Sequence, residues 1–371
     1  MTALQIGMTA ATTRRGGADR YFFDLFRALP PIGVELRGLV VGDPDDPLGA
    51  VRSFAAGDAS MLRRWVGIQK AFASLIEDAD LVASHFAAHT VAILHRIRSR
   101  PLVVHFHGPW KLENRIEGTG SVKATLQGSI ESAVYRRAAR LIVLSNAFGE
   151  ILVREYGVAR ERIRVIPGGV DLTRFSALGS RADARRVLGW PLDRPTVVTV
   201  RRLVRSKGLE RLVDAIDAVR KELPEILTII VGTGPLAAEL ESRVRERRLG
   251  AHVRLSGHVP DDALPHVYRA ADLCVVPSVA LEGFGLVVLE ALACGTPALV
   301  TPVGGMPEVV GPLAPALVLP DAGGAAIADG IVAALRGRIP LPDEQACREH
   351  AARFRWPCIA KRIKDVYDEV A

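Results

Sequence analysis

The sequence predicts two α/β domains, each built on a parallel sheet that helices cover on both faces. Short apolar segments alternate with longer amphipathic ones along the whole chain, as expected for strands and helices in turn. The strand segments are continuously apolar, which indicates burial on both faces of the sheet. At 371 residues the chain exceeds the roughly 250–300 residues beyond which single cores seldom grow, so two doubly wound domains are expected to face each other across a cleft.

The expected elements follow in order along the chain. The strands are predicted at residues 4–8, 34–41, 81–84, 102–106, 141–144, 163–166, 196–200, 227–231, 253–255, 273–277 and 297–301. The helices between them include residues 17–28, 58–78, 127–139, 209–221, 237–246, 263–270 and 286–293. A polar stretch at 175–194, bounded by prolines, separates the two series. We therefore expect an N-terminal domain over 1–175, a C-terminal domain over 176–355, and a last helix within 356–371 that crosses back to the first domain.

The composition is that of a chain with ample material for two cores. Hydrophobic residues make up 49% of it and charged residues 24%. No apolar run approaches the roughly 18 residues of a membrane-spanning helix, and the first residues do not resemble an export signal. The four cysteines show no CxxC spacing and are expected to be free thiols. These features predict a cytoplasmic protein.

The formal net charge of +7 lies entirely in the N-terminal half. Residues 1–186 carry 26 Lys and Arg against 18 Asp and Glu, whereas residues 187–371 carry 22 against 23. A basic surface favours an anionic partner, and the sequence has no motif that predicts nucleic acid. The segment 58–78 is amphipathic, with Arg63 and Lys70 on its polar face. An ordinary surface helix is favoured, and attachment to the anionic inner face of the cell membrane is the alternative.

The segment from Glu282 to Glu290 is the most informative in the chain. Gly283 and Gly285 suit a tight turn, and a buried helix is predicted to open on it at Leu286. Free backbone amides and the positive end of the helix dipole make such a turn a seat for phosphate. Glu282 would stand at its mouth and Glu290 one turn inside the helix, so one carboxylate can meet a sugar and the other a ribose. This geometry predicts a nucleotide-sugar site.

Three other loops follow predicted strands, at the edge where ligands bind in open α/β sheets. Gly16 and Gly17 would let the backbone approach a phosphate or an acceptor, although a plain turn explains them equally well. His107 is predicted to contact a sugar, and its neighbour His105 to be a hydrogen-bonded core residue rather than half of a metal site. Arg202 and Lys207 would converge on a diphosphate and stabilise its negative charge as it departs.

Together these segments resemble the retaining glycosyltransferases of family 4 (group 1), which have the GT-B architecture of two Rossmann-like domains. The likeness covers nearly the whole chain. It rests on Gly16-Gly17, His107-Gly108, Ser145, residues 167–171, Arg202, Lys207-Gly208, residues 232–235, and the pair Glu282 and Glu290. Two positions depart from the family pattern: Arg201 stands where a glycine is usual, either adding a charge near the phosphates or pointing to solvent, and Gly168 stands where an asparagine is common.

The resemblance implies a nucleotide diphosphate sugar donor on the C-terminal domain, with a UDP-sugar favoured and a GDP-sugar as the alternative. It implies a glycan, lipid-linked or small-molecule acceptor on the N-terminal domain, transfer with retention by same-face substitution, and no metal or cofactor. The expected catalytic residues are His107, Glu282, Arg202 and Lys207. The expected donor-binding residues are Arg202, Lys207, Gly234, Glu282, Gly283, Phe284, Gly285, Leu286 and Glu290. Gly16 and Gly17 are expected in the acceptor or phosphate loop.

Three other functions remain open on the sequence. A phosphorylase on the same fold would use a similar basic site, although the ribose-binding position of Glu290 argues against it. A catalytically silent nucleotide-sugar-binding subunit is disfavoured by the presence of His107, Lys207 and Glu282. A Rossmann oxidoreductase is the weakest alternative, because no GxGxxG motif follows the first strand.

Overall fold

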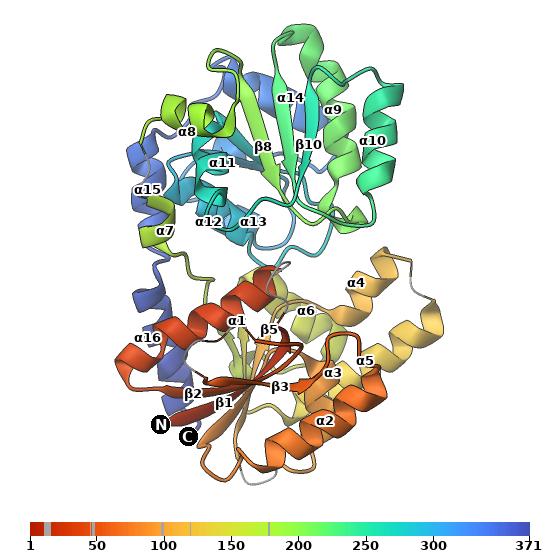
Figure 1. The fold of residues 1–371 in the computed structure, drawn as a ribbon, viewed down its shortest axis with the longest axis vertical. Coiled ribbons are helices and arrows are strands. Elements are labelled where there is room, and N and C mark those ends of the chain that lie inside the picture. The colour runs from red at the N-terminus through yellow and green to blue at the C-terminus, as the bar shows by residue number, and fades with distance from the viewer. Residues whose placement is uncertain (11–15, 45, 47–48, 98–99, 119, 177–178) are drawn as a thin grey trace. The chain divides into compact units, whose positions relative to one another are not determined.

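The chain folds into two compact units (Figure 1). The computed structural model describes residues 1–371 except 11–15, 45, 47–48, 98–99, 119 and 177–178. Unit 1 comprises Met1–Gly168 together with Trp356–Ala371, and unit 2 comprises Gly169–Arg355. The end of the chain therefore belongs to the same unit as its beginning.

Unit 1 is a parallel sheet whose strands, within the described residues, run in the order β3-β2-β1-β4-β5-β6-β7. The strands are β1 (Thr2–Thr9), β2 (Glu35–Val41), β3 (Val51–Ala55), β4 (Leu81–Ser84), β5 (Leu102–Phe106), β6 (Arg140–Val143) and β7 (Ile163–Val165). The order reverses between β1 and β4, so the loops that leave these two strands diverge. Ligands of doubly wound sheets bind at such a switch point, which here lies at the carboxyl ends of β1, β4 and β5.

Helices cover this sheet. They are α1 (Gly17–Ala28), α2 (Met61–Ala73), α3 (Ala87–Thr90), α4 (Trp110–Ile116), α5 (Ser121–Arg137), α6 (Asn146–Tyr156) and α16 (Trp356–Asp368). The rings of Tyr21 on α1 and Trp356 on α16 lie 5.4 Å apart between centroids. Beyond the last turn of α16, the Glu369 carboxylate accepts hydrogen bonds of 2.6 Å from both Arg140 and Arg164. Ring packing and this ion pair fix both ends of α16 on unit 1 (Figure 1).

Three elements of unit 1 differ from the sequence prediction. Helix α2 covers Met61–Ala73 and is shorter at both ends than the predicted helix at 58–78. Strand β3 was not predicted, because an edge strand needs few apolar residues and only Val51 and Phe54 of its five are buried. Helix α5 begins six residues before the predicted start at 127. Its first turns hold two large apolar side chains, Val122 and Leu126, and both are exposed, so this part of the helix has no apolar face packed on the core.

Unit 2 is a second parallel sheet, with the order β10-β9-β8-β11-β12 among the described residues. Its strands are β8 (Thr196–Val200), β9 (Leu227–Val231), β10 (Val253–Gly257), β11 (Leu273–Val276) and β12 (Ala298–Val300). Its helices are α7 (Leu172–Ser176), α8 (Arg181–Leu188), α9 (Leu209–Glu222), α10 (Ala237–Glu246), α11 (Leu264–Ala270), α12 (Leu286–Ala293), α13 (Met306–Val310), α14 (Gly324–Leu335) and α15 (Glu344–Ala352). The strand order reverses between β8 and β11. The prediction of two doubly wound α/β units is confirmed.

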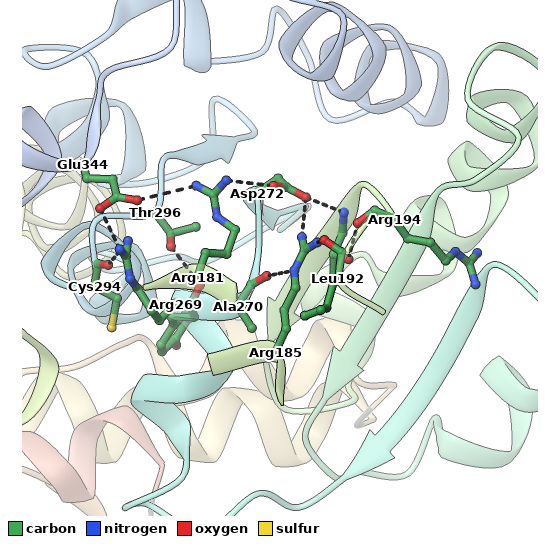
Figure 2. A network of polar contacts seen from close by, with 12 residues as sticks. Arg181, Arg185, Leu192, Arg194, Arg269, Ala270, Asp272, Cys294, Thr296 and Glu344 are labelled. Atoms are coloured by element: carbon green, nitrogen blue, oxygen red, sulfur yellow. Dashed lines mark hydrogen bonds and ion pairs between the residues drawn. The ribbon is translucent and has the colours of Figure 1, made fainter. Parts of the chain in front are cut away.

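The polar stretch at 175–194 holds a helix of unit 2. Ser180 and Asp183 form a capping box at the start of α8, and Gly189 ends it in the left-handed conformation. Figure 2 shows how α8 is fixed: Asp272, just before β11, accepts hydrogen bonds of 3.0 Å from Arg181 and 2.7 Å from Arg185. The many arginines of this stretch, which made it resemble a linker, thus serve packing.

A cavity of about 690 Å³ lies beside this network. Its lining includes Pro195, Asp272 and Pro297, the residues that directly precede β8, β11 and β12. It therefore opens at the amino-terminal edge of the sheet. Ligands of doubly wound sheets bind at the opposite, carboxyl edge, so this cavity does not lie where the functional site of unit 2 is expected.

Candidate functional site

In unit 2 the loops that leave β8, β9, β11 and β12 are packed into one another at the carboxyl edge. A side chain at Gly232, which has φ of +136°, would overlap the carbonyl oxygen of Arg201. A side chain at Gly304, with φ of +58°, would overlap the carbonyl oxygen of Glu282. Glycine is required at both positions, because backbone of one loop lies against backbone of the next. The loops thus form one rigid cluster around the switch point.

Glu282 is the centre of this cluster. Its side chain is only 11% exposed, and three donors converge on one of its oxygens, Oε2. These are the Arg201 guanidinium, the Lys207 ammonium at 3.1 Å and the Ser278 hydroxyl at 3.0 Å. None of the described residues donates to the other oxygen, Oε1, so this oxygen keeps its lone pairs for a ligand.

The charges around Glu282 fix its protonation state. Burial on its own would raise the pKa of the Glu282 carboxyl, but Arg201 and Lys207 outweigh burial and hold this pKa well below its ordinary range. At neutral pH the residue is a carboxylate with no proton to donate. It can accept hydrogen bonds from hydroxyl groups, and it cannot act as a general acid.

Lys207 and Arg202 lie on the loop after β8 as predicted, in different surroundings. The Lys207 side chain is 13% exposed and contacts Glu282. Arg202 is exposed, and its charge is close enough to contribute to the lowered pKa of Lys207, after the larger effect of burial. The structure therefore brings Glu282 and Lys207 together directly, with Arg202 beside them at the surface of unit 2.

Arg201 is the residue whose role sequence reasoning left open. Its side chain is 4% exposed and forms an ion pair with Glu282, so it does not point to solvent. Its Nη1 is buried without a hydrogen-bond partner in the described part of the chain. The sequence shows that an arginine stands where a glycine is usual, but it does not show that this arginine pairs with Glu282.

The segment after Glu282 adopts the predicted turn and helix. Gly285 has φ of +83° and caps α12, which begins at Leu286. Phe284 is buried, and its ring packs on Phe354 with centroids 5.7 Å apart. The ring of Phe284 is therefore occupied by packing within unit 2. Glu290, one turn inside α12, is 4% exposed and accepts a 2.7 Å hydrogen bond from Tyr268.

Gly234 belongs to the same edge of the sheet. It follows β9, and a side chain on it would overlap the backbone of Leu203. The Leu203 amide donates to Thr233 O at 2.9 Å, and the Leu236 amide donates to Leu203 O at 3.0 Å. Gly234 therefore holds the loops after β8 and β9 together and lies within the cluster.

In unit 1 the predicted His107 lies at the carboxyl end of β5, next to the switch point. Its Nε2 lies 2.9 Å from Nδ1 of His85, the residue that follows β4. Its ring also packs edge-on against Tyr21 of α1, with centroids 5.1 Å apart. Part of its surface stays accessible, yet burial of the ring lowers the pKa of His107 to about 4. His107 is therefore neutral at physiological pH.

His105 is buried at 2% exposure and hydrogen-bonded to two tyrosines, Tyr21 at 3.2 Å and Tyr367 at 2.8 Å. These contacts agree with the expected core histidine. His85 was not singled out from the sequence, although a histidine directly after a buried strand is the same signal that identified His107.

The glycine loop after β1 is described only in part. Residues 12–15 of the predicted loop lie outside the described residues. Gly16 caps α1, and its amide donates to the Asp19 carboxylate at 3.3 Å. Asp19 also accepts from the amide and hydroxyl of Thr9 at 3.3 and 3.2 Å, which ties the start of α1, including Gly17, to the end of β1.

Comparisons with known proteins agree with this architecture. The family model described as Glycosyl transferases group 1 matches residues 180–354, and that described as Glycosyltransferase Family 4 matches residues 15–174. A D-inositol 3-phosphate glycosyltransferase from Saccharomonospora viridis is 34% identical over 303 residues, which cover 78% of this chain and 70% of that protein. The chain therefore belongs to the group 1 glycosyltransferases of family 4.

Solved structures extend the likeness to the whole fold. Sucrose-phosphate synthase from Thermosynechococcus elongatus superimposes with a TM-score of 0.83 at 26% identity, over 100% of this chain and 98% of that one. HepE from Anabaena, solved in complex with UDP-glucose, gives a TM-score of 0.79 at 22% identity over the full length of both chains. These neighbours are GT-B glycosyltransferases, so the two doubly wound units form a GT-B fold.

Among the described residues, no helix is both long and apolar enough to span a bilayer. The same residues contain no group of three His, Cys, Asp or Glu side chains in a geometry that could hold a metal ion.

Proposed function

We propose that this protein is a retaining, metal-independent hexosyltransferase that moves a sugar from a UDP-sugar to an acceptor hydroxyl. The observation that carries the proposal is the meeting of Glu282 and Lys207 at the β8/β11 switch point, beside exposed Arg202. A nucleotide sugar requires an acceptor for its hydroxyl groups and cations for its diphosphate. Oε1 of Glu282 would be that acceptor, and Lys207 and Arg202 would be the two cations. HepE, which shares the fold, binds UDP-glucose, and this supports uridine over guanosine.

In the proposed donor complex each residue has one task. Lys207 and Arg202 bind the diphosphate and stabilise the charge that grows on it as the bond from C1 to the phosphate oxygen breaks. Glu282 orients the sugar by accepting its hydroxyls at Oε1, and Glu290 binds the ribose. Backbone of Gly283, Phe284 and Gly285, with the start of α12 at Leu286, lies along the phosphates. Because these cations neutralise the leaving group, no metal ion is required.

The reaction is proposed to proceed on one face of the sugar. The departing phosphate oxygen accepts the proton of the acceptor hydroxyl while that hydroxyl oxygen bonds to C1, so the anomeric configuration is retained. The surroundings of Glu282 support its role as an orienter rather than a nucleophile. A carboxylate held by Arg201, Lys207 and Ser278, with a strongly lowered pKa, is a poor nucleophile.

The acceptor is proposed to be a phosphorylated polyol bound by unit 1. The curated relatives are named for D-inositol 3-phosphate, and the positive excess of the chain lies in residues 1–186. Gly16 and Gly17 at the start of α1 are the proposed phosphate loop. His107 is proposed to contact the transferred sugar. Glycan and lipid-linked acceptors are the alternatives.

The test is a transfer assay in the presence of EDTA, followed by proton NMR. UDP-glucose or GDP-glucose is offered with inositol phosphate, inositol or a short glycan, and the product's anomeric coupling is read. An α-linked product from UDP-glucose and inositol phosphate would support every part of the proposal. A β-linked product would exclude retention, and activity only after Mg²⁺ is added would exclude metal independence. Phosphate-dependent breakdown of a glycoside would favour a phosphorylase, and binding without turnover a silent subunit.

A second proposal concerns peripheral attachment of unit 1 to an anionic membrane surface. On α2 the stripe of Ile68 and Phe72 is buried, as in an ordinary surface helix, but Leu62 and Val66 remain 69% and 48% exposed beside Arg63. Sedimentation with vesicles of anionic lipid should recover the wild-type protein and lose the Leu62→Ser, Val66→Ser variant. Equal recovery of both would exclude this surface.

A further inference from the structure

Behind His107, unit 1 contains a continuous chain of buried hydrogen bonds. The chain runs through six side chains in the order His107, His85, Gln5, Tyr367, His105 and Tyr21, at distances of 2.9, 2.8, 3.2, 2.8 and 3.2 Å. All of them except His107 are at most 5% exposed. The members come from β1, β5, the loops after β4 and β5, and the helices α1 and α16.

The histidines in this chain are held neutral. The rings of His85 and His105 stack with centroids 4.5 Å apart and planes 11° apart, and those of His85 and His107 stack at 5.2 Å and 17°. Two imidazolium ions at such distances would repel each other strongly in a buried site. Burial, followed by the neighbouring histidines, also lowers the pKa of His85 and of His105 well below the ordinary value. Each ring therefore has one nitrogen that donates and one that accepts.

The side-chain amide of Gln5 sets the direction of every bond in the chain. Its oxygen faces His85 and its nitrogen faces Tyr367. Because an amide oxygen only accepts, His85 carries its proton on Nε2, and its Nδ1 accepts from Nε2 of His107. In the other direction the amide nitrogen donates to Tyr367, whose hydroxyl donates to Nε2 of His105, and His105 donates from Nδ1 to Tyr21.

We infer that Gln5, His85 and Tyr367 are positioning residues that hold His107 in the Nε2–H tautomer, so that its Nδ1 is a hydrogen-bond acceptor for the substrate. Within the described residues the bond of the His107 ring is made by Nε2 and none is made by Nδ1, and His107 is the one member of the chain that is not buried. A turned Gln5 amide would reverse all five bonds and convert Nδ1 into a donor. Tyr367 links helix α16 to the tautomer of His107, although two hydrogen bonds, through Gln5, separate it from His85.

The inference rests on the proposed function for its consequence, in which His107 contacts the transferred sugar. An acceptor nitrogen requires a sugar group that can donate, such as a hydroxyl. A carboxylate in the same place would set two acceptors against each other in a buried site. The resemblance to family 4 implies that His107 lies near C6 of the transferred sugar, which is the carbon that carries the carboxylate in a uronic acid. The enzyme should therefore prefer a neutral hexose donor to the corresponding uronic acid donor.

The first experiment reads the tautomers directly in the full-length wild-type protein. With ¹⁵N-labelled histidine, two-dimensional NMR distinguishes the protonated from the unprotonated ring nitrogen by chemical shift, and a His107→Asn variant assigns the signal. We expect Nε2–H for His107 and His85 and Nδ1–H for His105. A dominant Nδ1–H form of His107, or a mixture of its two forms, would overturn the inference. This readout requires no substrate, so it stands even if the proposed reaction fails.

The second experiment uses Gln5→Met, with Gln69→Met as its matched control. Gln69 lies in the same unit and donates to Ala92 O at 3.0 Å, outside the chain. Gln5→Met should give a mixture of the two His107 tautomers. It should also reduce the preference for UDP-glucose over UDP-glucuronate by about tenfold, the worth of a single hydrogen bond, with little change in UDP affinity. Gln69→Met should change neither. An unchanged tautomer and preference in Gln5→Met would contradict the inference.

If Gln5→Met does not fold, Tyr367→Phe replaces it. That variant removes one hydroxyl and is compared with Tyr135→Phe, whose hydroxyl bonds Glu131 outside the chain. The inference is supported if His105 and His107 each become a mixture of two tautomers in Tyr367→Phe and stay in one tautomer in Tyr135→Phe. If both histidines keep their wild-type tautomer in Tyr367→Phe, the coupling through α16 is refuted.

Discussion

Replacing Arg201 by methionine tests how the centre of unit 2 is held together. Methionine keeps most of the side-chain volume and removes the charge that faces Glu282. The Arg201 side chain is 4% exposed and that of Glu282 is 11% exposed, so the ion pair is buried. Removing one partner of a buried pair costs about 3–5 kcal/mol, because the other charge is left uncompensated. Lys207 and Ser278 still contact Glu282, so we expect the lower end, about 3 kcal/mol.

The assay is equilibrium urea unfolding at pH 7 of a double-mutant cycle. The cycle contains the wild type, Arg201→Met, Glu282→Gln and the double variant, and it isolates the pair from other effects of each change. We expect a coupling of about 2 kcal/mol, since contacting residues of one network couple by about 0.5–3 kcal/mol. Arg202→Met is the matched control, because it removes the same charge from an exposed neighbour and should leave stability near that of the wild type.

The stability difference between the wild type and Arg201→Met should also depend on pH in a definite direction. The pKa of Glu282 is depressed, so its contribution to stability is fully present above the ordinary value of 4.5 and is lost as pH falls further. The difference between wild type and Arg201→Met should therefore shrink below pH 4.5. A coupling below about 0.5 kcal/mol, or a difference that does not change with pH, would refute the account of Arg201.

Two further predictions concern loops and histidines. Gly304→Ala should lower the free energy of unfolding by about 1–3 kcal/mol and weaken UDP binding, because the added side chain would overlap the carbonyl oxygen of Glu282. Gly250→Ala is the control, since its side chain would meet nothing within 4 Å, and it should change neither property. Equal calorimetric results for the two variants would contradict the packing of the loops. Burial lowers the pKa of His107 to about 4, so between about pH 6.5 and pH 4 the unfolded chain binds a proton at this residue that the folded chain does not. His107 therefore contributes about 1.4 kcal/mol per pH unit to the fall in the free energy of unfolding, in addition to the contributions of buried His85 and His105. His107→Asn should reduce the slope by this amount and exposed His95→Asn should leave it unchanged; the same slope in both would contradict the lowered pKa of His107.

The strands of both sheets were largely predictable because parallel strands buried on both faces leave continuous apolar runs. Four of them, β4, β5, β8 and β9, have the predicted bounds. The edge strand β3 was not predicted, because its exposed Arg52 and Ser53 break the apolar run. Helix α8 was hidden for a different reason. Its polar face dominates the composition, and only the Ser180–Asp183 capping box marks its start.

The candidate site was predictable where one residue type and one position define the chemistry. Glu282, Lys207 and His107 follow strands that the apolar pattern already locates, so their place at the carboxyl edge could be derived. The partners of these residues could not be derived. Arg201 and Glu282 are 81 positions apart, and Gln5 and Tyr367 are 362 positions apart. Only the folded sheet order brings such pairs together.

The claim that the loop cluster of unit 2 is the donor site is tested most directly by calorimetric titration of UDP in the presence of EDTA. The titration compares the wild type with Lys207→Met, which removes the buried ammonium, and with Lys221→Met, which removes an exposed one from the end of α9. We predict binding to the wild type and to Lys221→Met, and at least about tenfold weaker binding to Lys207→Met, as expected for loss of a charge-assisted bond to phosphate. Equal affinity for all three proteins, or binding only after Mg²⁺ is added, would contradict the account.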